Sequence, residues 1–132
     1  MARILVVDDQ AENRDLLAYL LRYFGHTVSV ASDGAAGVRA ALADPPDLVL
    51  MDIAMPVIDG LTAARQMRSH PELANTALIA ISATGSITRE TIRASGFDGF
   101  YPIPFEPAHF IAQLAPFLTG RPMAQAYQPS SP

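Results

Sequence analysis

Acidic residues follow two of the most apolar segments of the chain. Asp8 and Asp9 come directly after Ile4–Val7, and Asp52 comes directly after Leu48–Met51. Taken alone, each acid has a simple structural interpretation, as the end of a strand or the cap of a helix. If the two segments are parallel strands of one sheet, their ends meet at the same edge. Three carboxylates gathered there would repel one another unless a cation or hydrogen bonds compensated them.

A divalent cation is the simplest compensation for such a group of acids. Carboxylates together with water molecules are the ligands that suit Mg²⁺. Ser82 follows a third apolar segment, Ala77–Ile81, and adds a hydroxyl to the same predicted edge. Ligands of open parallel sheets bind outside the carboxyl ends of the strands. The pattern therefore predicts a magnesium site formed by Asp8, Asp9 and Asp52.

The composition excludes several classes of protein. A chain of 132 residues fits one compact domain, and the absence of cysteine excludes disulfide scaffolds, thiolate metal sites and cysteine catalysis. The net charge of −4 argues against direct binding to nucleic acid. The strongly apolar segments are too short for membrane insertion or for a signal peptide, which predicts a cytoplasmic protein. All nine basic residues are arginines, so the chain has no lysine.

Short apolar segments alternate with longer segments of helical period. Five segments are predicted strands: Ile4–Val7, Val28–Ala31, Leu48–Met51, Ala77–Ile81 and Phe100–Ile103. The first, third and fourth are apolar at nearly every position, as expected of central parallel strands covered on both faces. Pro102 cannot donate a backbone hydrogen bond, so the fifth strand is predicted at an edge of the sheet.

Five helices are predicted between and after these strands: Glu12–Phe24, Gly34–Ala43, a segment following Asp59, Ile87–Ser95, and a segment starting at Pro107. The apolar face of the first is predicted to comprise Leu16, Leu17, Leu20, Leu21 and Phe24. The alternation predicts an α/β fold of five βα units with right-handed crossovers. The proline- and serine-rich residues 120–132 are predicted to form a flexible tail.

Four motifs give the chain a resemblance to a known family: VVDDQ (Val6–Gln10), LVLMDIAMPVIDG (Leu48–Gly60), ISA (Ile81–Ala83) and GFDGFYPIPFEP (Gly96–Pro107). With them the chain resembles the receiver domain of two-component response regulators, of the single-domain type. The resemblance implies a doubly wound, flavodoxin-like five-stranded parallel sheet with strand order 2-1-3-4-5. It also implies a receiver domain over residues 1–119, followed by the tail.

The resemblance assigns roles to individual residues. Asp52 would accept a phosphoryl group, Asp9 would bind Mg²⁺ directly, and Asp8 would bind it through water. The remaining implied roles are a backbone carbonyl ligand at Ala54, a switch hydroxyl at Ser82, a switch aromatic at Phe100, and loop-shaping positions at Pro56 and Gly60.

One position departs from the family pattern. Receivers have a lysine before the Pro-Phe of the last strand, and this chain has Ile103 there. Arg89 is a candidate for a substituting cation. Loss of an ammonium group near the phosphoryl oxygens is expected to weaken the response to phosphorylation.

The main hypothesis is a phosphoacceptor signalling protein and not an enzyme. Its expected partners are a histidine kinase or histidine phosphotransfer protein, a downstream effector protein, and a second copy in a weak homodimer. The alternative hypothesis is a pseudo-receiver that binds a partner without phosphorylation. A third interpretation, an aspartate-nucleophile phosphatase, requires an acid two residues after the nucleophile, where this chain has Ala54.

Overall fold

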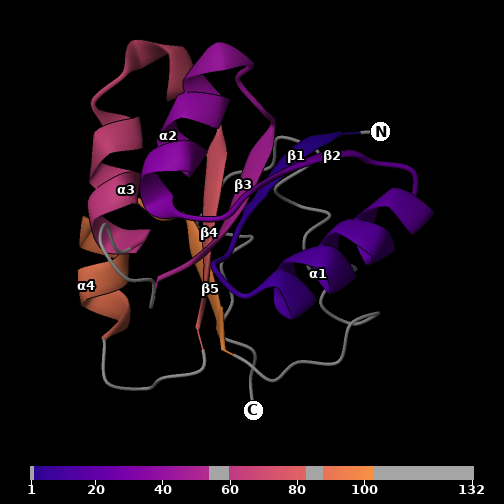
Figure 1. Ribbon diagram of the computed structural model, residues 1–132. Helices are drawn as coiled ribbons and strands as arrows, with labels where there is room; N and C mark the ends of the chain where they lie inside the picture. The colour runs from indigo at the N-terminus through magenta and orange to yellow at the C-terminus, as the bar shows by residue number, and fades with distance from the viewer. Residues whose placement is uncertain (1, 54–59, 83–87, 103–132) are drawn as a thin grey trace.

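The sheet has five parallel strands. The structure, a computed structural model, describes residues 2–53, 60–82 and 88–102 (Figure 1). The strands are β1 (Arg3–Val7), β2 (Thr27–Ala31), β3 (Leu48–Asp52), β4 (Ala77–Ser82) and β5 (Gly99–Pro102). Their order in the sheet is β2-β1-β3-β4-β5. This confirms the predicted fold class and the edge position of the strand that contains Pro102.

The helices lie between the strands, as predicted. They are α1 (Ala11–Tyr23), α2 (Gly34–Ala43), α3 (Gly60–Arg68) and α4 (Arg89–Ala94), with a short 3₁₀ helix η1 (Pro71–Leu73) that the sequence analysis did not include. The α4 helix lies within the predicted Ile87–Ser95; Thr88 caps its start by accepting from the backbone N–H of Thr91, and Ser95 is its C-cap. Ile87 lies outside the described residues. The predicted helix from Pro107 and the predicted tail lie outside the described residues.

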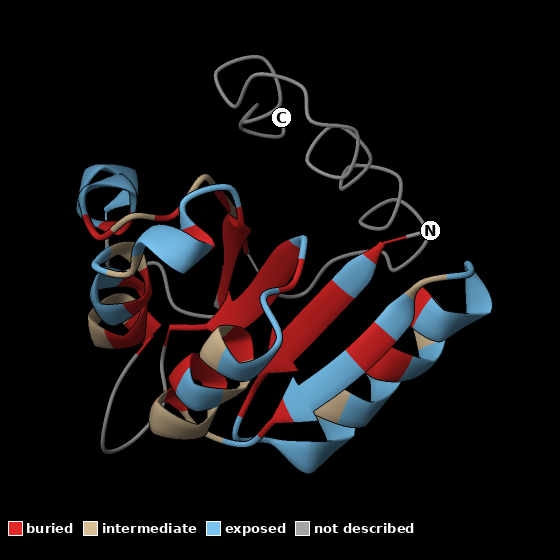
Figure 2. Cartoon of the chain, turned by 90° about the horizontal axis from the view of Figure 1, so that it is seen from above, coloured by how far each residue is buried: buried red, intermediate tan, exposed pale blue. Residues whose placement is uncertain are grey.

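The sheet separates two hydrophobic clusters. In β1, Ile4 and Val6 pack in the cluster under α1, whereas Leu5 and Val7 pack in the cluster under α2 and α3. In β3 all five residues are buried, which explains its continuous apolar sequence. Figure 2 shows the buried residues concentrated in the sheet and on the helix faces turned toward it.

The apolar face of α1 differs from the prediction at two positions. Leu16 is 52% exposed and Phe24 is 50% exposed, so both lie outside the core. The buried side of the helix is centred on Leu17, Ala18 and Leu21. Adjacent leucines point in directions about 100° apart on a helix, so they cannot all face one sheet. The prediction that Leu16 and Phe24 belong to the buried face is therefore wrong.

An arginine network joins α3 to the sheet at the amino ends of β4 and β5. The Arg68 guanidinium donates to the carbonyl oxygens of Gly96 (Nε, 2.9 Å) and Leu73 (Nη1, 3.0 Å), and its Nη2 lies 2.6 Å from Oδ2 of Asp98. The same carboxylate oxygen accepts from the backbone N–H of Leu78 at 2.9 Å. Burial raises the pKa of Asp98, and the Leu78 N–H and Arg68 act in the opposite direction without cancelling it.

Replacing Arg68 with methionine is expected to lower the free energy of unfolding by about 2 kcal/mol. Methionine keeps much of the apolar side chain but leaves two carbonyls and a partly buried carboxylate without this partner. Urea denaturation would measure the loss. The matched control is Arg3→Met, whose ion pair with Asp44 is exposed on both sides, so its loss is expected below about 1 kcal/mol. Equal losses in the two variants would contradict the role given to Arg68.

Candidate functional site

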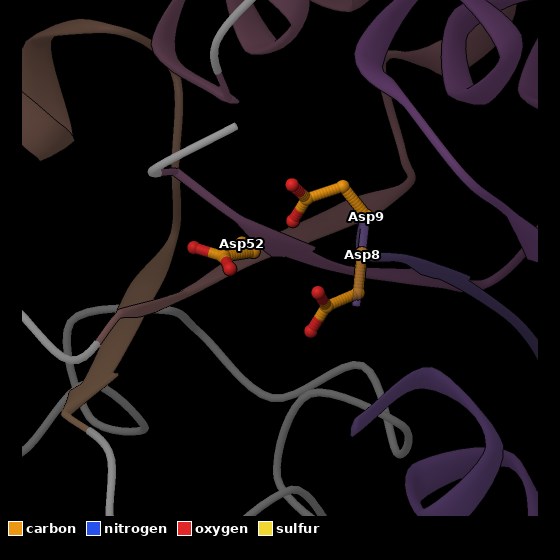
Figure 3. A group of neighbouring side chains, drawn as sticks. All are labelled: Asp8, Asp9 and Asp52. Atoms are coloured by element: carbon orange, nitrogen blue, oxygen red, sulfur yellow. The ribbon is translucent and has the colours of Figure 1, made fainter. Parts of the chain in front are cut away.

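The acids of the two central strands meet at the carboxyl edge of the sheet, as the sequence predicts. The strands β1 and β3 are hydrogen-bonded neighbours in which Val7 is opposite Met51, so Asp8 and Asp52 follow at matching positions. One oxygen each from Asp8, Asp9 and Asp52 lies within 4.8 Å of the others. Figure 3 shows Asp8 and Asp9 at the end of one strand and Asp52 at the end of its neighbour.

Backbone hydrogen bonds fix the position of Asp8. Its N–H donates to the carbonyl oxygen of Ala31 at 3.1 Å, which extends the pairing of β1 with β2 by one residue. Its carboxylate oxygen Oδ1 accepts from the N–H of Gln10 at 2.9 Å. The helix α1 begins at the next residue, Ala11. The turn between strand and helix thus holds the Asp8 side chain inside the protein, where it is fully buried.

The buried carboxyl of Asp8 is in an unfavourable environment when it is ionised. Burial raises its pKa to about 6, and the negative charges of Asp52 and Asp9 act in the same direction. The Gln10 N–H and the positive charge of Arg14 lower it in part. Its other oxygen, Oδ2, is buried and has no hydrogen-bond partner among the described residues. An unpartnered carboxylate oxygen beside two further acids is a donor set that fits a hard divalent cation such as Mg²⁺.

A close backbone contact holds Asp52 against the start of α3. Asp52 is the last residue of β3 and is 8% exposed. A Cβ atom at Gly60 would lie 2.5 Å from the Cα of Ile53 and 2.6 Å from the carbonyl oxygen of Asp52. The N–H of Gly60 also donates to the carbonyl oxygen of Ile53 at 3.3 Å. Only a glycine lets the two backbone segments approach this closely.

The other predicted site residues are placed only in part. Ser82 is the last residue of β4, one position beyond Ile81, which is opposite Asp52 in the sheet. Phe100 lies in β5, is half-buried and packs against the cluster under α2 and α3. The remaining predicted positions, Ala54, Pro56 and Ile103, lie outside the described residues. The roles given to these residues stay predictions.

One cation near the acids was not predicted from the sequence. Arg14 is half-buried, and its Nη1 donates to the carbonyl oxygen of Asp8 at 3.0 Å. By contrast, Arg89, the cation suggested from the sequence, is exposed at the start of α4. The spacing of Arg14, one turn into the helix that follows Asp9, is the signal that could have identified it.

Comparison with known sequences gives a consistent result. Residues 4–115 match the family model described as the response regulator receiver domain. The chain is 32% identical over 117 residues to the response regulator MprA of Mycobacterium ulcerans, covering 88% of this chain and 50% of that protein. It is 31% identical over 120 residues to the DNA-binding dual master transcriptional regulator RpaA of Synechocystis, covering 89% and 49%. The chain thus spans about half the length of the curated relatives it matches.

Solved structures agree with these sequence matches. The chemotaxis response regulator CheY4 of Vibrio cholerae has a TM-score of 0.83 at 26% identity, covering 89% of this chain and 99% of that chain. The receiver domain of a sensor histidine kinase from Pseudomonas aeruginosa has a TM-score of 0.82 at 29% identity, covering 89% and 98%. That structure has a magnesium ion coordinated in its active-site cleft. Within the described part of this chain, no helix has the length and hydropathy needed to cross a membrane.

Proposed function

The chain belongs to the response regulator receiver family, and on that basis we propose that it accepts a phosphoryl group on Asp52 from a phosphohistidine. The observation that carries this proposal is the cluster of three carboxylate oxygens within 4.8 Å. Beside it, the buried Oδ2 of Asp8 has no hydrogen-bond partner in the part of the chain that the structure describes. A purely structural role would gain nothing from a buried carboxylate oxygen held beside two further negative charges.

Mg²⁺ would be held by Asp8, Asp9 and Asp52, with the backbone carbonyl of Ala54 as a further ligand that the family resemblance suggests. When bound, it would supply positive charge that offsets repulsion between the carboxylates and the incoming phosphoryl group. The family resemblance suggests direct ligation by Asp9, which is exposed, and a water-mediated role for Asp8, which is buried.

In the proposed reaction an oxygen of the Asp52 carboxylate attacks the phosphorus atom. The new oxygen–phosphorus bond forms as the nitrogen–phosphorus bond of the donor histidine breaks, and the released imidazole keeps the bonding electron pair. The acyl phosphate carries about two negative charges where the carboxylate carried one. Phosphorylation therefore adds about one negative charge to a site that is already acidic.

We propose that this added charge is read by Ser82 and Phe100. A hydroxyl at the end of β4 can donate a hydrogen bond to a phosphoryl oxygen, which is the role that the resemblance suggests for Ser82. Phe100 lies on the neighbouring strand and is half-buried, so a change in its rotamer would alter the surface near β5. The partners would be a histidine kinase or phosphotransfer protein as donor and an effector protein as receiver of the signal, in the cytoplasm.

A second candidate function is a pseudo-receiver that binds its partner without phosphorylation. The observation that favours it is Ile103, which stands where the family has a lysine. The same acidic site would then bind Mg²⁺ without accepting a phosphoryl group.

The experiment that separates the two functions is treatment with acetyl phosphate and Mg²⁺, followed by intact mass measurement. The wild type is expected to gain one phosphoryl group, and Asp52→Asn is expected to gain none, because an amide is not a nucleophile here. Asp15→Asn removes the same charge from an exposed position of α1 and serves as the control.

Three outcomes of this experiment are informative. Equal labelling of wild type and Asp52→Asn would contradict Asp52 as the acceptor. Labelling that a chelator does not reduce would contradict the need for a divalent cation. No labelling of the wild type, by acetyl phosphate or by a phosphohistidine donor, would support the pseudo-receiver instead.

A further inference from the structure

Arg14 is the part of the site region that the family assignment leaves unexplained. It occupies the fourth position of α1, near the amino end of the helix. A cation there faces the positive end of the helix dipole, so the position is unfavourable for the helix itself. The side chain nevertheless folds back toward the strand and is half-buried.

The hydrogen bond of Arg14 holds its charge beside the acids. Nη1 donates to the main-chain carbonyl oxygen of Asp8 at 3.0 Å and not to a carboxylate. A guanidinium has five N–H donors, and this is the one hydrogen bond recorded for it among the described residues. One oxygen each from Asp8, Asp9 and Asp52 lies within 4.8 Å of the others. The hydrogen bond to the main chain of Asp8 therefore places the guanidinium next to a residue of the acidic cluster.

We propose that Arg14 supplies the fixed positive charge that stabilises the phosphoryl group on Asp52. The inference rests on the proposed phosphoacceptor function. The chain has no lysine, and a fixed cation beside the acids would stabilise the added negative charge of the phosphoryl group. Arg14 is held in place before the reaction by the carbonyl of Asp8, so it requires no rearrangement to act.

This role has a signature that a structural role lacks. Replacing Arg14 with glutamine removes the charge and keeps an N–H donor for the Asp8 carbonyl. The acidic cluster then attracts Mg²⁺ more strongly and anions less strongly. General damage to the site would weaken the binding of both. Opposite changes in cation and anion binding therefore identify an electrostatic contribution.

The experiment measures both affinities by isothermal titration calorimetry, with Mg²⁺ alone and then with beryllofluoride in the presence of saturating Mg²⁺. In Arg14→Gln, Mg²⁺ is expected to bind about threefold to tenfold more tightly, and beryllofluoride about tenfold more weakly. The rate of labelling by acetyl phosphate is expected to fall by a similar factor. Arg14→Lys keeps the charge and is expected to stay within about threefold of wild type in all three measurements.

Arg22→Gln is the matched control on the same helix. Arg22 also donates to a main-chain carbonyl, that of Val28, at 3.0 Å, but from the last turn of α1. The Arg22→Gln variant is expected to bind Mg²⁺ and beryllofluoride with wild-type affinity. Weaker binding of both probes in Arg14→Gln, or wild-type binding of both, would overturn the inference while the phosphoacceptor function stands. If the wild type takes up neither beryllofluoride nor a phosphoryl group, the proposed function falls, and this inference falls with it.

Discussion

Substituting Gly60 with alanine is expected to lower the free energy of unfolding by about 3 kcal/mol or more and to weaken Mg²⁺ binding. The added methyl group would lie 2.5 Å from the Cα of Ile53 and 2.6 Å from the carbonyl oxygen of Asp52. Both are backbone atoms, which cannot move aside as a flexible side chain can. The start of α3 must therefore shift away from the end of β3, and Asp52 must shift with it.

Gly25→Ala provides the control for this substitution. Gly25 has a φ of 95°, and a Cβ atom there would have no heavy atom within 4 Å. The substitution is expected to lower the free energy of unfolding by about 1 kcal/mol, through backbone conformation alone. Gly25 lies just after the end of α1, away from the acids. Chemical denaturation and Mg²⁺ titration of both variants test the difference. If Gly60→Ala binds Mg²⁺ as the wild type does, the contact between Gly60 and Asp52 does not position the acid.

Asp8→Asn is expected to make the metal-free protein more stable at pH 7.5, by about 3 kcal/mol at most. The pKa of Asp8 is raised from 3.8 to about 6, and a shift of this size corresponds to about 3 kcal/mol between the two protonation states. Asparagine keeps an oxygen to accept from the Gln10 N–H and removes the buried negative charge. Saturating Mg²⁺ is expected to stabilise the wild type more than the variant, because the variant lacks one of the acids.

The pH dependence of this difference has a definite sign. Between pH 4 and 6 the folded protein binds a proton at Asp8 more tightly than the unfolded chain does. The stabilisation that the folded protein gains from the proton on Asp8 is therefore largest below pH 4 and is lost as the pH rises through about 6. Above that pH the free energy of unfolding no longer changes through this group. The stability of Asp8→Asn relative to wild type should grow over this interval and then level off.

Asp15→Asn, which removes an exposed acid, should show no such pH-dependent gain. Thermal unfolding in a chelator across the pH range is the measurement. A variant less stable than wild type at pH 7.5 without metal would contradict the conclusion that the buried charge of Asp8 destabilises the metal-free protein.

The sheet could be predicted from the sequence because each central strand is buried on both faces. Such strands have uninterrupted apolar sequences, and in β3 all five residues are buried. The meeting of Asp8, Asp9 and Asp52 could also be predicted, since parallel strands end at the same edge and both acidic segments follow apolar ones. Pro102 indicated the edge position of β5 for a reason of hydrogen bonding alone.

Tertiary contacts set the features that could not be predicted. Leu16 has the hydrophobicity of a core residue, but the neighbouring Leu17 takes the buried position on α1. The side chain of Arg14 is placed by the carbonyl oxygen of Asp8, six residues earlier in the chain; its spacing after Asp9 is a signal for this position, but helix propensity is not. The role of Gly60 depends on how closely α3 starts to β3, which is a property of the packed backbone.

The arginine network of Arg68 and Asp98 has a consequence for protein engineering. It fastens α3, β4 and β5 at the amino ends of the strands, whereas the acids lie at the carboxyl ends. The hydrogen bonds that hold α3 to the sheet and the acids of the candidate site therefore lie at opposite ends of the strands. A designer could graft new connections onto the carboxyl ends, to change what the site binds, and retain the hydrogen bonds of Arg68 and Asp98 that hold the scaffold together.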